Sequence, residues 1–586
     1  MHGAREVTCH FGPSPRHESS LGGNELNRRH TWKWLLTAAS LAVGVALIAS
    51  ACGSSSNKTN TSGSGATTSG GTASGGKTFA NFRLAYDTGI DYLDPGLSYT
   101  VEGWGIMWNV YLPLIGYKHA NGPDGATLVP YLAQAMPKVS SDAKTYTFTL
   151  RKGLKYSDGT AIKASDFAAT IERDFKVDSP GVGFFGNIVG ADTFGKTKTG
   201  HISGITTDDA TGVITVKLNA PQGDFLNILA TEFAALLPAS TPAKDQSTTP
   251  APSSGPYMIK SYSPNKKAIV VRNPNFDATM LDGNVPAGNP DMMTVDIIGD
   301  DTVALQRVIS GQDDYDFHQI PPDRLASTQQ KYGSQIKVYT PANTYYFFMN
   351  TRVAPFDNLK VRQAVNYAIN REALIRIYGG LGQPTENVLP PTYPSYKKLS
   401  LYPYDLAKAK QLITESGQKG ASVTVWNHDR GTDPKASAYL TDVLNSIGLN
   451  AKEKVINSAV YWTTVGNQAT KAQIGFADWF QDYPHPLDWF DVLLNGERIT
   501  QTHNNNYANF DDKAVNAKID ALKKEPTLTD SVNADWATVD KMVDQQAPWA
   551  AFMNRQFTDF FNSDIDLSCY VNHVLYQFDF AAICHT

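Results

Sequence analysis

The chain has 586 residues, more than one hydrophobic core usually supports, so two or three domains are expected. Hydrophobic residues make up 41% and charged residues 18%, a balance that suits a folded body rather than a disordered chain. The net charge is −5, and no strongly basic segment follows residue 51, which argues against nucleic-acid binding.

The N-terminus is expected to be an export signal that ends at residue 51. Arg28, Arg29 and Lys33 supply a positive segment, and an apolar, alanine-rich run over 35–49 follows. Small residues then precede Cys52, a pattern similar to a lipobox, in which the cysteine is diacylated and becomes the mature N-terminus. The alternative is an ordinary secretory signal followed by an incidental cysteine.

Residues 53–77 are almost entirely Gly, Ser, Thr and Ala. This composition predicts a flexible tether with an r.m.s. span of about 25–30 Å. Two acyl chains make a stable membrane anchor, whereas one binds only marginally. We therefore expect a signal peptide over 1–51 and, over 52–77, a lipidated tether that holds the protein on the outer face of the cytoplasmic membrane.

Strand and helix signals alternate along the first half of the body. We expect a strand at Phe82–Tyr86 and a helix over 104–114. Tyr146, Phe148 and Leu150 alternate with threonines, which predicts another strand. Ser165 is expected to be the N-cap of a helix that carries apolar side chains on one face. Further strands are expected at 202–206 and 213–218, and a β-hairpin is expected after Gly255, with its turn at Pro264 to Lys267.

The second half continues with helices and strands. Residues 338–350 are expected to cross into another domain and form a strand. Asn358 and Asn370 are good N-caps, so two successive helices are predicted after them. A helix after Asp405, a strand near 423–426, a helix near 436–447 and a returning strand near 550–561 complete the pattern.

Three blocks of sequence resemble the family 5 solute-binding proteins, the extracytoplasmic receptors of peptide, dipeptide and nickel ABC importers. The first block contains Leu132-Ala133, Tyr146 to Gly153, and Asp158 to Asp166. The second contains Gly255-Pro256-Tyr257 and the later Asn273-Pro274-Asn275-Phe276, and the third runs from Asn350 to Glu372. The blocks are spread over most of the chain after the tether.

The resemblance implies an α/β, two-lobed periplasmic-binding-protein-like fold (type II, cluster C) with a small extra domain inserted in lobe I. Ligand would be enclosed between the lobes by hinge closure. The resemblance implies that lobe I is built from residues 78–111, 236–341 and 547–586. The inserted domain II would span 112–235, and lobe II would span 342–546.

The same resemblance assigns a ligand site to the stretch from Ile474 to Phe490. In peptide-binding members an Asp in this stretch pairs with the ligand's α-ammonium, and here it is Asp482. A desolvated carboxylate that meets a cation makes a strong, charge-assisted bond. Alternatively, Asp482 caps the following turn or pairs with an internal Arg. His485 stands where many relatives carry an acidic residue, so the ligand class stays open.

Further ligand contacts are expected from aromatic and loop residues. The walls of such sites accept many side chains because aromatic faces are apolar and adaptable. A structural role in the core is an equal alternative for an isolated Trp such as Trp462. The resemblance and the aromatic pattern together give these expected contacts: Trp479, Tyr483, Trp462, Trp426, Tyr99 and Val101.

Two cysteines stand close together near the C-terminus. With Cys52 lipidated, Cys569 and Cys584 are the remaining thiols of the exported chain, and a disulfide is expected in an oxidising compartment. Metal ligation by His573, Cys584 and His585 is the alternative, although the spacing fits no common site. We expect no metal and no cofactor.

The resemblance implies a binding protein rather than an enzyme. The expected partners are a peptide ligand, two permease subunits with their ATPases, and the membrane through the lipid anchor; the protein is expected to be a monomer and to bind no nucleic acid. A receptor for nickel, another metal chelate or an oligosaccharide is the alternative on the same fold. A surface hydrolase that uses an acid pair from Asp478, Asp482 and Asp488 is the alternative from another class, although no catalytic motif is present.

Overall fold

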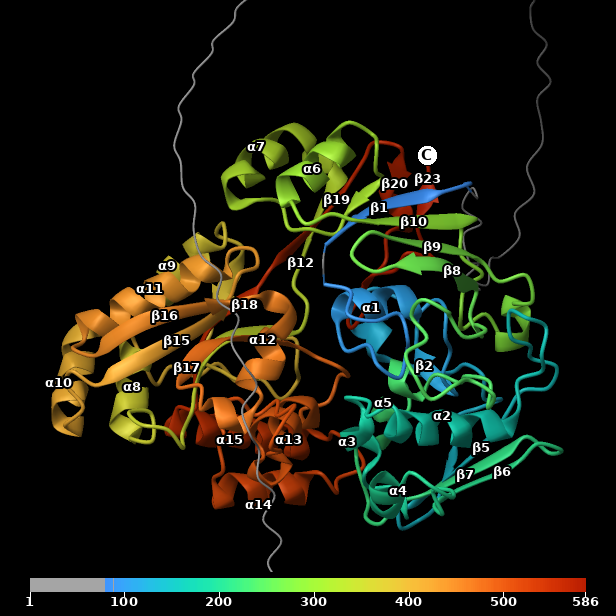
Figure 1. Ribbon diagram of the computed structural model, residues 1–586, viewed down its shortest axis with the longest axis horizontal. Coiled ribbons are helices and arrows are strands. Elements are labelled where there is room, and N and C mark those ends of the chain that lie inside the picture. Colours follow the sequence, from blue (N-terminus) through green and yellow to red (C-terminus); the bar gives the residue numbers. More distant parts are fainter. Residues whose placement is uncertain (1–78, 88) are drawn as a thin grey trace, which may run out of the picture. The chain divides into compact units, whose positions relative to one another are not determined.

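A computed structural model describes residues 79–87 and 89–586 (Figure 1). The expected signal peptide, Cys52 and the tether lie outside the described residues. Within the described part of the chain, no helix is both long enough and apolar enough to cross a bilayer.

The first large sheet has seven strands and contains β1 near its middle. β1 is parallel to both of its neighbours, β10 and β11, while the other pairs are antiparallel. The β8–β9 hairpin confirms the hairpin predicted after Gly255. In spatial order the strands are β12 (Ile336–Tyr339), β19 (Phe557–Phe561), β11 (Tyr315–Asp316), β1 (Phe82–Tyr86), β10 (Met292–Ile297), β9 (Lys267–Arg272) and β8 (Tyr257–Ser263).

The second large sheet has six strands and lies in the second half of the chain (Figure 1). Every residue of its strand β13 is buried, as expected for a strand covered on both faces. In spatial order the strands are β14 (Gly382–Pro384), β18 (Trp549–Arg555), β13 (Asn343–Met349), β17 (Ile474–Phe480), β15 (Ser422–His428) and β16 (Asn450–Ile456).

Alternate residues of β13 divide between two hydrophobic clusters. Tyr345 and Phe347 pack with α8 (Leu359–Ala368), α9 (Arg371–Ile377), α10 (Leu406–Ser416) and α11 (Asp433–Ser446). Tyr346 and Phe348 pack with α12 (Ser458–Val465), α13 (Leu487–Leu494), α14 (Lys513–Leu522) and α15 (Asp530–Gln546). The period of two along the strand therefore places one helical layer on each face of the sheet.

A four-stranded sheet forms from the sequence between β1 and β8, which are both strands of the seven-stranded sheet. Its order is β4 (Lys138–Val139), β5 (Thr145–Thr149), β7 (Val213–Lys217) and β6 (Ile205–Asp208). The helix α2 (Ala164–Lys176) buries Phe167 and Ile171 in the same core as Phe148 and Ile214 from the strands.

Three local predictions were wrong. The helix expected over 104–114 is α1 (Val101–Met107), because Thr100 accepts a hydrogen bond from the Gly103 backbone and starts it earlier. Ser165 is not an N-cap, because α2 already begins at Ala164, and its hydroxyl donates to Asp209 instead. The strand expected from residue 202 begins at Ile205.

The chain passes between the two large sheets at two points. The first lies between β12 and β13 and the second between β18 and β19. We expected the chain after residue 546 to lie in lobe I, but β18 pairs with β13 and β14, so the second crossing comes at Gln556. The register of β18 depends on strands some two hundred residues earlier, which local sequence does not reveal.

Candidate functional site

The turn that follows β17 presents Asp482, and it is held in place by a second acid. The Asp482 backbone N–H donates to Asp488 Oδ2 at 3.0 Å, and the indole Nε1 of Trp479 donates to the same oxygen at 3.2 Å. Asp488 is fully buried near the start of α13. It therefore fixes both the backbone of Asp482 and the ring of Trp479.

The Asp482 side chain meets a residue from the far end of the sequence. The hydroxyl of Tyr99 donates to Asp482 Oδ2 at 2.5 Å, across 383 residues. Tyr99 lies just before α1, and its ring centroid is 6.3 Å from that of Trp479 and 5.4 Å from that of Phe233. The structure thus brings together Tyr99, Trp479 and Asp482, three of the predicted site residues.

Asp482 and Asp488 are buried among few polar groups, and burial affects the ionisation of both carboxyl groups. Burial raises the pKa of Asp482 to about 7, while the hydrogen bond from Tyr99 favours the ionised form. Burial also raises the pKa of Asp488, and the neighbouring Asp482 charge adds to that effect. Within the described residues, no Lys or Arg nitrogen lies within 4.0 Å of Asp482, so the alternative of an internal Arg partner is not supported. A cation brought to Asp482 would favour its ionised form.

Tyr483 points elsewhere, although it follows Asp482 directly. Its hydroxyl donates to Asp224 Oδ2 at 2.8 Å, and its ring centroid is 6.0 Å from that of Phe184. It is 1% exposed. Tyr483 therefore connects the turn after β17 to Asp224 and Phe184, beside Asp482.

His485, the departure from the family pattern, is a neutral turn residue. Burial lowers its pKa to about 4. Its Nδ1 accepts a hydrogen bond from the Leu487 backbone N–H at 3.2 Å. A neutral imidazole at this position brings no charge to the ligand region.

The remaining predicted contacts make no hydrogen bond or ring contact with Asp482 among the described residues. Trp462 on α12 is 37% exposed, and its ring lies 5.8 Å from those of His428 and Tyr507. Trp426 on β15 is buried in the cluster that also contains Tyr346, with Lys454 Nζ 3.9 Å from its ring centroid. No hydrogen bond or ring contact within 79–87 and 89–586 joins either Trp to Asp482. Val101, the first residue of α1, is half-buried.

Sequence reasoning missed Arg430, which lies in the turn between β15 and α11. Its guanidinium donates to Asp87 and, at 3.0 Å, to Glu102 Oε1. Asp87 follows β1 and Glu102 is in α1, so the contact spans more than 300 residues of sequence. A lone Arg in a polar turn carries no signal of partners so distant, and only the three-dimensional arrangement reveals it.

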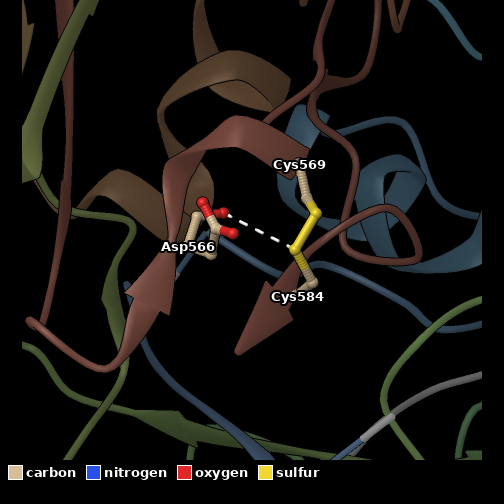
Figure 2. Close-up of side chains that lie close together, drawn as sticks. All are labelled: Asp566, Cys569 and Cys584. Atoms are coloured by element: carbon tan, nitrogen blue, oxygen red, sulfur yellow. Dashed lines mark hydrogen bonds between the residues drawn. A yellow bond between two sulfur atoms is a disulfide. The ribbon is translucent and has the colours of Figure 1, made fainter. Parts of the chain in front are cut away.

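Cys569 and Cys584 form a disulfide with a Cα–Cα distance of 5.8 Å (Figure 2). Asp566 lies beside it, with its backbone oxygen 3.8 Å from Cys584 Sγ. Both sulfurs are used in the bond and are not thiolates, so this trio has no metal-binding character. His573 Nε2 contacts the backbone oxygen of Gly125 at 2.8 Å, which is a structural role in the C-terminal segment.

Comparisons with known proteins point to one family. The model of "Bacterial extracellular solute-binding proteins, family 5 Middle" matches residues 127–501. The glutathione-binding protein GsiB of Salmonella choleraesuis is 28% identical over 363 residues, which is 58% of this chain and 66% of that protein, slightly less than two thirds of its length. Heme-binding protein A of Haemophilus influenzae is 28% identical over 476 residues, covering 75% of this chain and 80% of that protein.

The fold is also similar to solved structures. The structure titled clavulanic acid biosynthesis oligopeptide binding protein 2 superposes with a TM-score of 0.78 and 25% identity, over 87% of this chain and 96% of that one. The two-lobed α/β architecture predicted from sequence is thereby confirmed.

Proposed function

Because the chain belongs to the family 5 bacterial extracellular solute-binding proteins, we propose that it is the receptor of an ABC importer and captures short peptides between its lobes. The observation that carries the proposal is Asp482, a desolvated carboxylate with no basic partner among the described residues, held beside two aromatic rings. A peptide α-ammonium is the cation that this arrangement suits.

The peptide main chain would lie against backbone groups, with side chains in hydrated pockets, as in sequence-tolerant peptide recognition. After closure the receptor would dock on permease subunits, which are served by ATPases on the other side of the membrane. Anchoring through a diacylated Cys52 would keep it at the membrane surface. The proposed assembly state is a monomer.

The proposal also includes the absence of catalysis. The matched family and the similar structure are binding proteins. Among the described residues, Asp478 makes no hydrogen bond to Asp482 or Asp488, so the three acids do not form one cluster. A fluorogenic hydrolase screen that found turnover abolished by Asp482→Ala would overturn this part.

Native mass spectrometry of the gently purified protein tests the main proposal. We expect a ladder of adduct masses that match short peptides. The ladder should disappear after unfolding and refolding and should be weaker in Asp482→Asn. One discrete non-peptide mass that is indifferent to that substitution would contradict the proposed ligand and leave a receptor for a chelate, heme or sugar.

A further inference from the structure

The C-terminal segment between Cys569 and Cys584 carries a short β-hairpin. Its strands β21 (Asn572–His573) and β22 (Gln577–Phe578) are antiparallel, and residues 574–576 form its tip. The disulfide joins the two ends of the segment (Figure 2). The hairpin is therefore the middle of a closed loop rather than a free chain end.

The tip of this hairpin contacts the turn that presents Asp482. Gln481, the residue before Asp482, donates from Nε2 to the Val574 backbone oxygen at 3.0 Å. Its Oε1 accepts a hydrogen bond from the Tyr393 hydroxyl at 2.7 Å, and the residue is 7% exposed. Both polar atoms of the Gln481 side chain are thus bonded, and one of the partners belongs to the C-terminal hairpin.

The same hairpin lies against the segment that carries Tyr99. The ring centroid of Tyr576 is 4.5 Å from that of Trp108, the C-cap of α1, and the two rings are stacked. Tyr99 lies two residues before the start of α1. The hairpin therefore contacts both segments that are joined by the hydrogen bond from Tyr99 to Asp482.

His573 fixes the tip from within the hairpin. Its Nδ1 accepts a hydrogen bond from the Leu575 backbone N–H at 3.1 Å, and its Nε2 donates to the Gly125 backbone oxygen at 2.8 Å. Burial lowers the pKa of His573 to about 3, so the ring is neutral and has the one acceptor and one donor that these bonds need. The tip is thereby held in the conformation that offers the Val574 oxygen to Gln481.

We propose that Gln481 and the β21–β22 hairpin are positioning elements of the ligand site, which hold the Asp482 carboxylate where a ligand ammonium meets it. This inference rests on the proposed peptide-binding function. Gln481 acts through the backbone that it shares with Asp482. A carboxylate whose turn is fixed in advance loses less conformational entropy when it binds a cation. Loss of the bond to Val574 should therefore weaken recognition of the ammonium in particular.

Calorimetry with Ala-Ala-Ala and its N-acetylated form at pH 7.5 tests the inference. The measured quantity is the ratio of the two affinities, because a loss of overall stability affects both peptides alike. Wild-type protein should prefer the free amine by about tenfold or more. In Gln481→Met, which keeps the length of the side chain and removes its amide, the ratio should fall by about threefold or more.

Further variants assign the effect to the hairpin. His573→Phe keeps an aromatic ring beside Trp108 but loses both hydrogen bonds, so its ratio should fall as well. If Gln481 and His573 act on one contact, the double variant should have the same ratio as Gln481→Met alone. Asn289→Ala is the matched control, because the Asn289 amide donates to the Ala582 backbone oxygen at 3.0 Å, in the same C-terminal segment but outside the hairpin. Its ratio should stay within twofold of wild type.

The possible results separate the two proposals. Ratios within twofold of wild type in both Gln481→Met and His573→Phe would overturn the inference and leave the receptor function standing. Equal losses in Asn289→Ala and Gln481→Met would also overturn it, because the effect would not be specific to the hairpin tip. No binding of either peptide to wild-type protein would overturn the proposed function and this inference together. His573→Phe decides the matter if Gln481→Met does not fold.

Discussion

The hydroxyl of Tyr99 donates to the carboxylate of Asp482 at 2.5 Å, joining two residues that are 383 positions apart. The contact places a phenol on the carboxylate proposed to bind the ligand ammonium. Under that proposal, Tyr99 and the ligand ammonium share the Asp482 carboxylate as their acceptor.

Ligand affinity should depend on pH through Asp482. Its pKa in the unliganded protein is about 7, and an ammonium pairs only with the ionised form. Affinity for a peptide with a free amino group should therefore fall by up to about tenfold per pH unit below 7, and it should fall again above about pH 8, where the peptide α-amino group loses its proton. Calorimetry between pH 5 and 8.5 measures this, and Asp482→Asn is the control.

In Tyr99→Phe the midpoint of the affinity–pH curve should move to higher pH, because the hydrogen bond that favours the ionised form of Asp482 is lost. Affinity independent of pH over the whole range would show that Asp482 does not bind the ammonium.

Loss of Arg430 should destabilise the unliganded protein modestly. Its side chain is 42% exposed, so its two ion pairs are screened by solvent and together contribute about 1 kcal/mol. Urea unfolding of Arg430→Gln against wild type measures the difference. Arg324→Gln, whose partner Asp323 is highly exposed, is the control and should change stability by less. Equal stability of Arg430→Gln and wild type would mean that the contacts with Asp87 and Glu102 add nothing.

The role of Asn370 as the N-cap of α9 can be tested with two substitutions of this residue. The Asn370 side chain accepts a hydrogen bond from the Ala373 backbone N–H at 3.0 Å. Asn370→Ala should lower the free energy of unfolding by about 1 kcal/mol, while Asn370→Asp should retain the cap and remain near wild type. Chemical denaturation compares the three proteins. A deficit in the Asp variant as large as that in the Ala variant would contradict the capping role.

The C-terminal disulfide should contribute to stability by restricting the unfolded chain. Cys569 and Cys584 are 15 residues apart, a loop for which the chain-entropy model gives about 3 kcal/mol. The double variant Cys569→Ser/Cys584→Ser should lose up to that amount in denaturant unfolding, and wild type under reducing conditions should behave like it. Unchanged stability in both would indicate that packing alone holds the C-terminal segment, including the buried Phe580 and Ile583.

Features fixed by neighbouring residues were predictable from sequence. Asn358 and Asn370 are the N-caps of α8 and α9, as predicted, because capping depends on three or four consecutive residues. Ser165 shows the limit of this reasoning, because several polar residues compete at a helix start and the structure places Ser165 inside the first turn.

Contacts between residues far apart in the chain could not be predicted from the sequence in the same way. The resemblance to known receptors predicts a ligand-binding role for Asp482, yet neither its bond with Tyr99 nor the contact of Arg430 with Glu102 has a sequence signal. The position of β18 was missed for the same reason, because strand pairing is decided by partners far along the chain. Trp426 illustrates a further ambiguity, since a buried Trp in a strand and a Trp in a ligand wall have the same pattern in sequence.

The most direct test of the account compares a short peptide with its N-acetylated form. A charge-assisted bond contributes about 1.5–3 kcal/mol, so acetylation should weaken binding to wild-type protein by about tenfold or more, measured by calorimetry at pH 7.5. In Asp482→Asn the two forms should bind alike. If the acetylated peptide binds wild-type protein as tightly as the free amine, Asp482 is not an ammonium receptor and the proposed ligand orientation is wrong.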